Sequence, residues 1–544
     1  MKKSLRQCGI LLAISSLPSK YGIGTFSSEA YDFVDFLKKS GQSLWQILPL
    51  GPTGYGDSPY QSFSTFAGNP YYIDLEEFID YGWISEKDCE KYNYGNEHFV
   101  EYNVIFDAKF ALLKKAFKKS GFGEKAGATF VTLAKSTAEK PGVEKVETEK
   151  PGVERSAINS TTEEERSFAD MLREEFENFV MANSSWLEDY ALYMSVKDSL
   201  KGISWTEWPE DIKLRRPKAV KEYSKKLEES IRFYNFQQFF FYRQWKKLKM
   251  YANNNGIQIV GDIPIYVAMD SADTWANPEL FELDKDCRPI NVAGCPPDAF
   301  TAKGQLWGNP LYRWDYLKET GYEWWMQRMA HSFEMVDIIR IDHFRGFDEY
   351  YAIPFGREDA VIGSWKKGPG LDLFKTMKEK LGDRPVIAED LGFLTNSVRK
   401  MVKKSGFPGM KVLQFAFDSR EESDYLPHNY DRNCVVYTGT HDNDTSRHWF
   451  DTLAKADKSF AKRYLDIKSP KDAVNRLIRA ALSSVADTCI IPMQDYLELG
   501  GEARMNFPST LGYNWKWRMD CCMTSEEQAE EIRKLCKLYG RVGQ

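Results

Sequence analysis

The sequence lacks the signatures of several common classes of protein. Its nine cysteines include no CxxC pair and none has a metal-like spacing to the six histidines. Cys521 and Cys522 are adjacent, which suits neither a metal site nor an ordinary disulfide. No glycine-rich stretch carries the lysine of a P-loop or the spacing of a dinucleotide fingerprint. These absences predict a protein without a metal or an organic cofactor, whose free thiols are typical of a reducing cytoplasm.

An excess of positive charge and a long apolar run are also missing. The net charge of −6 argues against nucleic acid as a partner. No apolar run approaches the roughly 20 residues of a membrane-spanning helix, so no membrane partner is expected. The N-terminal MKKSLRQCGILLAISS mimics a signal peptide, but its apolar run at residues 10–14 is short and no small-residue cleavage site follows. We therefore expect a cytoplasmic location.

The 544-residue chain does contain ample apolar and aromatic material. Hydrophobic residues make up 42% of it, enough for a large core, and aromatic residues 14%. Sugar rings present apolar C–H faces that stack on aromatic side chains, so this content is compatible with a carbohydrate-binding protein. Most of the aromatic residues are nevertheless expected to pack in the core.

One stretch, MVDIIRIDHFRGFDEY, organises the rest of the chain. Its apolar residues 336–341 are typical of a strand buried on both faces. Asp342 follows directly, between Arg340 and Arg345. Two neighbouring guanidinium charges would keep this carboxylate ionised, which suits a nucleophile or an electrostatic stabiliser. The alternative is a salt-bridged strand end that only anchors a loop.

Two later stretches have the same design and favour the catalytic interpretation. In RPVIAEDLGF, a short apolar run ends in Glu389, 47 residues after Asp342. In CVVYTGTHDNDT, an apolar run ends in His441 and Asp442, the latter 53 residues after Glu389. These intervals fit parallel strands joined by crossovers. Because parallel strands end at the same edge, the three carboxylates would converge at the C-terminal face of a barrel.

The predicted fold class is α/β, with one (β/α)8 barrel over residues 1–544 and helical and loop insertions around the C-terminal face of its strands. Amphipathic stretches such as EAYDFVDFLKK separate the apolar runs and have their apolar positions at helical spacing. Eight apolar runs are the candidate strands: residues 9–14, 43–48, 257–263, 336–341, 386–388, 412–417, 435–438 and 489–492.

Three segments are expected to depart from the barrel pattern. Residues 72–250 have a helical bias, which predicts a helix-rich subdomain inserted between the second and third strands. Within them, residues 120–165 are polar and repeat EKPGVEK as EKPGVER. Such a composition cannot bury a core, so a disordered insert is predicted. Residues 268–330 include the proline- and glycine-rich stretch VAGCPPDAFTAKGQLWGNPLYRW and are predicted to form a loop-rich insertion at the active site.

The blocks RIDHFRGF, VIAEDLG and YTGTHDND resemble the three catalytic blocks of the amylomaltases. These are the 4-α-glucanotransferases, or disproportionating enzymes, of glycoside hydrolase family 77 in the α-amylase superfamily. The resemblance extends over nearly all of the chain except the low-complexity insert. It implies that Asp342 is the nucleophile, Glu389 the acid/base and Asp442 the stabiliser of the transition state. It also implies that Arg340 and His441 orient this set.

The same resemblance implies a set of substrate-binding residues. The DSPYQ block contributes Tyr60, which would stack on glucose, with Ser58 beside it. Tyr55 matches a tyrosine of a secondary glucan-binding groove, and a rigid structural loop is the alternative for it. The later positions come from the third strand, the loop that overhangs the site and the RMN sequence: Asp262, Gln305, Trp307 and Asn506.

The implied function is transfer of α-1,4-glucan segments from a maltooligosaccharide or glucan to the 4-hydroxyl of another glucan or of glucose. The mechanism would be retaining, through a covalent glucosyl-enzyme. Expected partners are maltooligosaccharides and glycogen or starch-type glucans. An α-1,4-glucan hydrolase is one alternative, although the amylase histidine is missing and Tyr266 and Val267 stand in that region. A non-catalytic glucan-binding protein is the other, and the presence of all three acids disfavours it.

Overall fold

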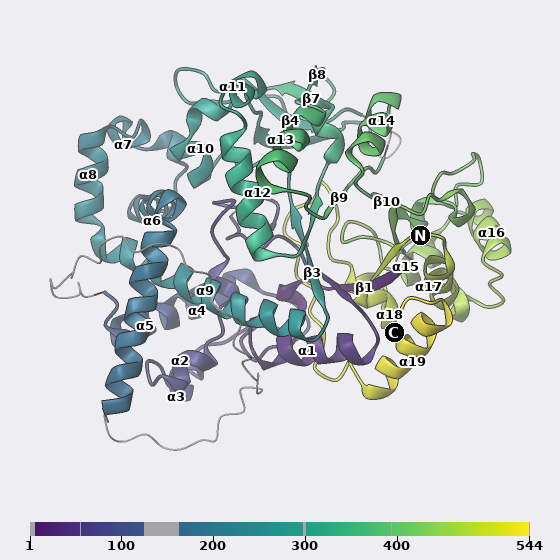
Figure 1. Cartoon of the computed structure of the whole chain (residues 1–544), viewed down its shortest axis with the longest axis horizontal. Helices are drawn as coiled ribbons and strands as arrows, with labels where there is room; N and C mark the ends of the chain where they lie inside the picture. Colours follow the sequence, from purple (N-terminus) through teal and green to yellow (C-terminus); the bar gives the residue numbers. More distant parts are fainter. Residues whose placement is uncertain (1–5, 55, 124–162, 298–300, 393, 543–544) are drawn as a thin grey trace.

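The computed structural model describes most of the chain, and Figure 1 shows its course. Most of the predicted low-complexity insert, and Tyr55 with its predicted secondary glucan site, lie outside the described residues. The described residues are 6–54, 56–123, 163–297, 301–392 and 394–542.

Eight parallel strands close into a barrel, so the predicted fold class is confirmed. The strands neighbour one another in the order β1-β12-β11-β10-β9-β6-β3-β2, which returns to β1. Helices surround this barrel (Figure 1). The strands are β1 (Gln7–Leu11), β2 (Leu44–Gln46), β3 (Gln258–Ile263), β6 (Ile338–Ile341), β9 (Val386–Ala388), β10 (Gly409–Val412), β11 (Cys434–Tyr437) and β12 (Thr488–Pro492).

One predicted strand is displaced along the chain. The apolar run at residues 412–417 was expected to be the sixth strand, but β10 ends at Val412 and Leu413–Phe415 forms a 3-10 helix. The strand begins instead at Gly409, which pairs with Ala388 of β9 and Cys434 of β11. Apolar content alone does not separate a strand from the buried turn that follows it.

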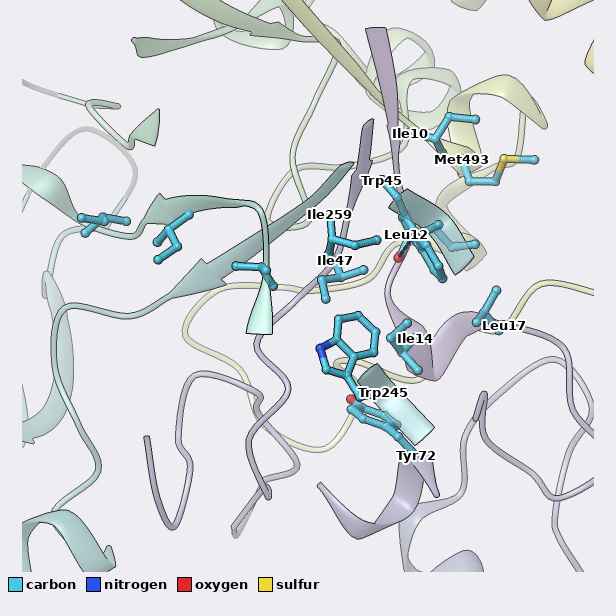
Figure 2. Close-up of a cluster of buried hydrophobic side chains, with 14 of the residues drawn as sticks. Ile10, Leu12, Ile14, Leu17, Trp45, Ile47, Tyr72, Trp245, Ile259 and Met493 are labelled. Atoms are coloured by element: carbon cyan, nitrogen blue, oxygen red, sulfur yellow. Dashed lines mark hydrogen bonds between the residues drawn. The ribbon is translucent and has the colours of Figure 1, made fainter. Parts of the chain in front are cut away.

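The strands bury both of their faces, as expected for a parallel barrel. In β1, Leu11 belongs to the cluster inside the barrel, whereas Ile10 belongs to the layer between barrel and helices. Figure 2 shows this outer layer, in which Trp245 of a surrounding helix lies close to Ile47. The indole N–H of Trp45 donates to the Leu12 carbonyl at 2.9 Å, which satisfies a buried polar group.

Among the described residues between β2 and β3 there are eight helices, which lie in the predicted helix-rich segment. The longest, α9, carries a continuous aromatic surface that packs against α4, α5 and α6. In Figure 1, α5 to α8 lie to the left of the barrel. The eight are α2 (Glu76–Asp80), α3 (Glu86–Cys89), α4 (Tyr102–Ser120), α5 (Glu163–Ala182), α6 (Ser184–Ser199), α7 (Glu210–Lys213), α8 (Pro217–Lys226) and α9 (Glu228–Asn254).

The other described helices follow the barrel strands in turn, except that two 3-10 turns, Leu413–Phe415 and Pro427–Asn429, stand between β10 and β11. The C-terminal helix α19 packs against the first helix α1 (Figure 1). The helices outside the segment between β2 and β3 are α1 (Ser28–Lys39), α10 (Ala272–Ala276), α11 (Trp314–Glu319), α12 (Glu323–Met335), α13 (Leu371–Leu381), α14 (Asn396–Ser405), α15 (Ser446–Thr452), α16 (Lys455–Tyr464), α17 (Ala473–Ser483), α18 (Met493–Tyr496) and α19 (Glu526–Leu538).

A small antiparallel sheet, ordered β5-β4-β7-β8, is built from two insertions into the barrel. Its strands β4 (Asn291–Cys295) and β5 (Gln305–Pro310) follow β3, and β7 (Glu349–Pro354) and β8 (Ser364–Lys367) follow β6. Since β7 begins seven residues after Asp342, this sheet is tied directly to the catalytic edge of the barrel. Within the described part of the chain, no helix combines the length and apolar character needed to cross a membrane.

Candidate active site

Strand register places the predicted acids side by side. In the pair of β3 and β6, Asp262 lies opposite Arg340, and in the pair of β6 and β9, Ile341 lies opposite Ala388. Asp342 and Glu389 are the next residues along these last two strands. Because neighbouring strands are roughly 4.8 Å apart, the two carboxyl-bearing residues leave the barrel side by side at one level.

The β6 side of the site comprises Asp262, Arg340, Asp342 and Glu389. The Arg340 guanidinium lies 2.6 Å from Asp262 Oδ2 and 3.2 Å from Asp342 Oδ1. Residues 340 and 342 are two apart in an extended chain, so their side chains share the inner face. The side chains of Asp262 and Arg340 are 0% and 3% exposed, whereas that of Asp342 is 28% exposed. The buried Asp262–Arg340 pair therefore supports the more accessible Asp342 from below.

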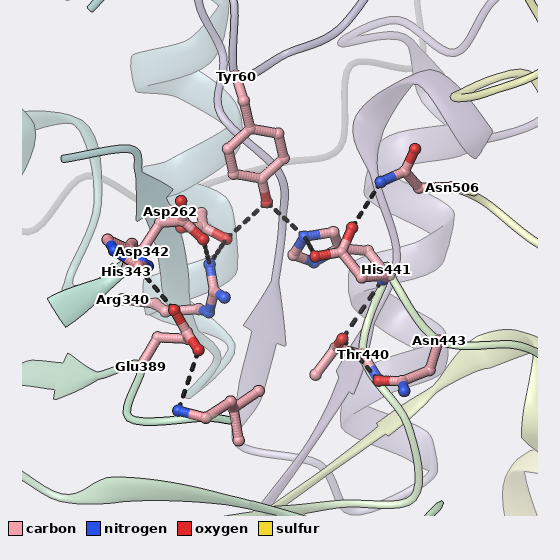
Figure 3. Close-up of polar contacts among 12 residues, drawn as sticks. Tyr60, Asp262, Arg340, Asp342, His343, Glu389, Thr440, His441, Asn443 and Asn506 are labelled. Atoms are coloured by element: carbon pink, nitrogen blue, oxygen red, sulfur yellow. Dashed lines mark hydrogen bonds and ion pairs between the residues drawn. The ribbon is translucent and has the colours of Figure 1, made fainter. Parts of the chain in front are cut away.

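Glu389 is held by backbone donors. The N–H of His343 donates to Glu389 Oε2 at 2.7 Å, and the N–H of Leu391 donates to Oε1 at 3.1 Å. Figure 3 shows the contact between His343 and Glu389 beside Arg340. His343 has a φ of 50°, in the left-handed region that non-glycine residues rarely adopt. This sharp turn after Asp342 is what aims the His343 N–H at the neighbouring carboxyl.

The β11 side comprises His441, Asp442 and Asn506. His441 Nε2 lies 3.4 Å from Asp442 Oδ2, and the amide of Asn506 donates to Asp442 Oδ1 at 2.6 Å. Arg504 donates to the backbone carbonyl of Asp442 at 3.1 Å. Asn506, which is predicted to bind substrate, also holds the carboxyl of Asp442 through its amide.

Tyr60 joins the two sides through its hydroxyl group (Figure 3). The hydroxyl lies 2.9 Å from Asp262 Oδ2 and 2.8 Å from His441 Nε2. A hydroxyl has one proton and an ionised carboxylate only accepts, so Tyr60 donates to Asp262 and accepts from His441. This arrangement assigns a proton to Nε2 of His441.

The carboxyl groups of the β6 side are hard to ionise. Loss of hydration raises the pKa of Asp342 to about 7, against the opposing charge of Arg340, and Glu389 raises it further. Loss of hydration also raises the pKa of Glu389, although Arg340 and the two backbone N–H donors act in the opposite direction. The Asp342–Glu389 pair therefore retains a proton near neutral pH.

Asp442 shows the opposite behaviour. Loss of hydration alone would raise its pKa, but the charge and hydrogen bond of His441, together with the Asn506 amide, hold that pKa well below its usual range. Burial alone would lower the pKa of His441, and Asp442 raises it instead. The β11 side therefore holds an ionised Asp442 beside a histidine whose pKa is raised by that carboxylate.

The sequence-based expectation about the two arginines is wrong for Arg345. Its guanidinium stacks over the ring of Trp365 in β8, 4.3 Å from the ring centre, and the ion pair that Asp342 forms among the described residues is with Arg340. One guanidinium shared with Asp262 does not offset the loss of hydration, so the pKa of Asp342 rises rather than falls. Arg345 is close to Asp342 in sequence, but it follows the tight turn at His343, and its side chain points away from Asp342 toward Trp365.

The predicted overhanging loop contributes Gln305 and Trp307 of β5. The indole N–H of Trp307 donates to Gln305 Oε1 at 3.0 Å, and the ring packs edge-on against His343 with centroids 4.8 Å apart. Burial lowers the pKa of His343 to about 3, so this imidazole is neutral. Trp307 of β5 therefore packs against His343, the residue whose backbone N–H holds Glu389.

Two further observations complete the site. Ser58 Oγ accepts from the backbone N–H of Tyr60 at 3.3 Å, so this predicted substrate-binding residue shapes the Tyr60 loop. Trp515, which sequence reasoning missed, packs on Tyr60 and His441 with ring centroids 5.6 and 5.9 Å away. Its only sequence signal is its place in the YNWKW stretch that closes the chain's last loop.

A closed (β/α)8 barrel with paired carboxyls at the C-terminal ends of its strands, flanked by aromatic rings, defines a class: carbohydrate-active barrel enzymes that work with two carboxyl groups. Comparisons with known proteins narrow this class. A family model described as 4-alpha-glucanotransferase matches residues 12–140 and 129–524. A 4-alpha-glucanotransferase from Clostridium butyricum is 46% identical over 531 residues, which cover 97% of this chain and 99% of that protein.

Two other relatives agree. A 4-alpha-glucanotransferase from Thermus thermophilus is 42% identical over 544 residues, 99% of each chain. The structure of an amylomaltase from Streptococcus agalactiae in complex with acarbose has a TM-score of 0.88 at 38% identity, covering 99% of this chain and 100% of that one. The chain belongs to the 4-α-glucanotransferase (amylomaltase) family, glycoside hydrolase family 77, and the function is glucan transglycosylation. The findings favour transfer over the hydrolase alternative.

Proposed function

We propose that Asp342 is the nucleophile and Glu389 the acid/base of a retaining transfer between α-1,4-glucans. In the first step, the ionised carboxylate of Asp342 attacks the anomeric carbon while Glu389 gives its proton to the departing glycosidic oxygen. A covalent glucosyl-enzyme forms and the leaving glucan departs with a new hydroxyl group. This step needs one proton on the pair, which is the state that the raised pKa values favour near neutral pH.

In the second step, the 4-hydroxyl of an acceptor glucan attacks the same carbon and gives its proton to Glu389. The bond to Asp342 breaks, and a glycosidic bond replaces the one lost. The ionised Asp442 and the protonated His441 are proposed to bind sugar hydroxyls and to stabilise the positive charge that develops at the anomeric carbon.

The observation that carries this proposal is the register of β6 and β9. Because Ile341 pairs with Ala388, Asp342 and Glu389 leave adjacent strands at one level. Their expected separation, roughly one strand spacing of 4.8 Å, is close to the approximately 5–5.5 Å between the two carboxyls of retaining enzymes.

Substrate binding is proposed to involve two buried polar atoms. Among the residues that the structure describes, Asp262 Oδ1 and His441 Nδ1 have no hydrogen-bond partner. Buried polar atoms without partners are costly, so hydroxyls of a bound glucose unit would offset that cost. Tyr60, Trp307 and Gln305 form walls on which maltooligosaccharides or glycogen and starch-type glucans are proposed to stack. Acarbose in the Streptococcus agalactiae amylomaltase structure supports this class of ligand.

The organisation and location of the chain are part of the same proposal. Residues 1–544 are proposed to act as one catalytic barrel in the cytoplasm, with residues 72–250 as an inserted subdomain and residues 268–330 as the cover of the site. A cover with aromatic walls would hold a second glucan while holding a lone water poorly.

Incubation with maltotriose tests the proposal. Transfer preserves the number of glycosidic bonds, so the reducing ends should stay constant while glucose and longer oligomers appear together. A rise in reducing ends at the rate of glucose release would replace transfer by hydrolysis. The variant Asp342→Asn, with no transfer and the same circular dichroism spectrum as the wild type, would support the role of the nucleophile.

A further inference from the structure

A tight turn at residues 520–523, with the sequence Asp-Cys-Cys-Met, gathers sulfur and oxygen atoms on the surface. The backbone N–H of Met523 donates to the Asp520 carbonyl at 3.1 Å, which closes the turn. The thiols of Cys521 and Cys522 are both on exposed residues, and their sulfur atoms lie 3.7 Å apart. In an extended strand adjacent side chains point to opposite faces, so the turn is what brings these two together.

The carboxyl group of Asp520 completes a compact set of ligand atoms. Its Oδ1 accepts from the thiol of Cys521 at 3.3 Å and from the backbone N–H of Cys522 at 3.0 Å. One carboxylate oxygen and the two sulfur atoms all lie within 4.8 Å of one another. A third sulfur, that of Met523, accepts weakly from the N–H of Asp520 at 3.4 Å, so the turn also has a soft, polarisable neighbour.

These distances suit one particular type of ion. Two thiolates bound tetrahedrally to Zn²⁺ at about 2.3 Å are separated by roughly 3.8 Å. The observed 3.7 Å between the two sulfur atoms needs almost no rearrangement to reach this geometry. A hard ion such as Mg²⁺ or Ca²⁺ would instead require mainly oxygen ligands.

We propose that Asp520, Cys521 and Cys522 bind a thiophilic cation of the Zn²⁺ type, with an exchangeable fourth ligand from solvent. On binding, each thiol loses its proton to the buffer, and the metal keeps its oxidation state while two metal–sulfur bonds and one metal–oxygen bond form. The site is distinct from the catalytic carboxyls. It revises the sequence-based view that adjacent cysteines suit no metal site.

The turn is anchored to the barrel, so binding should be felt in the stability of the fold. The N–H of Met519 donates to the Ser16 carbonyl at 2.8 Å, and Ser16 Oγ donates to the Trp517 carbonyl at 2.8 Å. A ligand that binds the native turn and not the unfolded chain raises the melting temperature, and the rise grows with the logarithm of the ligand concentration above Kd.

Metal titration of the full-length protein tests the proposal. The reduced wild type should take up one Zn²⁺ per chain in competition with a chromogenic chelator. Cd²⁺, used as a spectroscopic probe, should give an ultraviolet thiolate-to-metal charge-transfer band. The variants C521S/C522S and C522S should lose the band and the Zn²⁺-dependent rise in melting temperature. D520N should bind about tenfold or more weakly.

The matched control is C295S, which removes one thiol elsewhere and should bind like the wild type. Glucan transfer at the wild-type rate by C521S/C522S shows that this variant is folded. Equal uptake of metal by the wild type and C521S/C522S would overturn the proposal, as would the absence of a Cd²⁺ band in the wild type at one equivalent.

Discussion

The two sides of the barrel mouth hold carboxyl groups whose pKa values move in opposite directions. On the β6 side, the pKa of Asp342 rises to about 7 and that of Glu389 also rises. On the β11 side, the pKa of Asp442 falls although this group too loses hydration. Loss of hydration alone therefore does not decide the protonation state of an acid in this site.

The difference lies in the ratio of donors to carboxyl groups. Within the part of the chain that the structure describes, Arg340 is shared as the ion-pair partner of both Asp262 and Asp342, and Glu389 adds a third carboxyl nearby. Asp442 has its own imidazole and its own amide, from His441 and Asn506. Shared positive charge leaves a proton on the β6 side, where a proton donor is needed, and dedicated donors keep Asp442 ionised.

The largest expected effect comes from removing the nucleophile. Asp342→Asn should lower kcat on the order of 10⁴-fold or more, because an amide cannot form the glucosyl-enzyme. The measurement is the rate of glucose release from maltotriose, with the exposed Asp383→Asn as a control that keeps full activity. Activity of the Asp342 variant within tenfold of wild type would remove this residue from the nucleophile role.

Removing the proton donor should have a smaller effect. Glu389→Gln keeps an acceptor for the His343 N–H but cannot give a proton, so transfer from maltotriose should fall by about 10²–10⁴-fold. A donor with a good leaving group, α-glucosyl fluoride, needs little protonation and should lose much less activity in forming the intermediate. Equal losses with both donors would show that Glu389 acts by position alone.

On the β11 side, Asp442→Asn should reduce kcat/KM by about 10²–10³-fold, because it removes charge that stabilises the transition state. It also removes the partner that raises the pKa of His441, so this pKa should fall. The titration of the imidazole can be followed by NMR. An unchanged His441 titration would mean that Asp442 and His441 are not paired as the structure shows.

The pH profile of the wild type tests the raised pKa values of the β6 side without a mutation. Asp342 must be ionised to attack, and a pKa raised to about 7 means that protonation removes the nucleophile as the pH falls below 7. The kcat/KM should then decrease about tenfold per pH unit, and at higher pH it should decrease again as the pair loses its remaining proton. A flat profile between about pH 5 and 7 would contradict the assignment.

The smallest effect is expected where the two sides meet. Tyr60→Phe keeps the ring and removes the hydroxyl that bridges Asp262 and His441. The loss of these hydrogen bonds is worth about 1–1.5 kcal/mol, so kcat/KM should fall about five- to tenfold. A loss as large as that of Asp442→Asn would mean that the bridge, rather than each side separately, sets the charges.

Much of the site could be predicted from the sequence because catalytic acids follow apolar strands in a recognisable pattern. The ends of β6, β9 and β11 gave Asp342, Glu389 and Asp442 together with their neighbours Arg340 and His441. The displaced start of β10 could not be predicted, since Leu413–Phe415 is as apolar as a strand and yet forms a 3-10 helix.

Other features depended on folding. Trp515 comes from the end of the chain and meets Tyr60 and His441 only in the folded barrel. Arg345 is three residues from Asp342 in sequence, and the left-handed turn at His343 sends it to Trp365 instead. A sequence pattern indicates which residues are near one another in the chain. The contacts of Trp515 and Arg345 depend instead on which residues are near one another in space.

The sequence by itself determined the fold class, the family and the identity of the chemical groups, because periodic burial and short blocks of residues specify them locally. The tertiary structure decided how those groups are charged and paired. A pKa depends on hydration and on every charge within a few ångströms, and strand register sets those distances. The same holds for residues 520–523, where adjacent cysteines have a common direction only because the backbone turns.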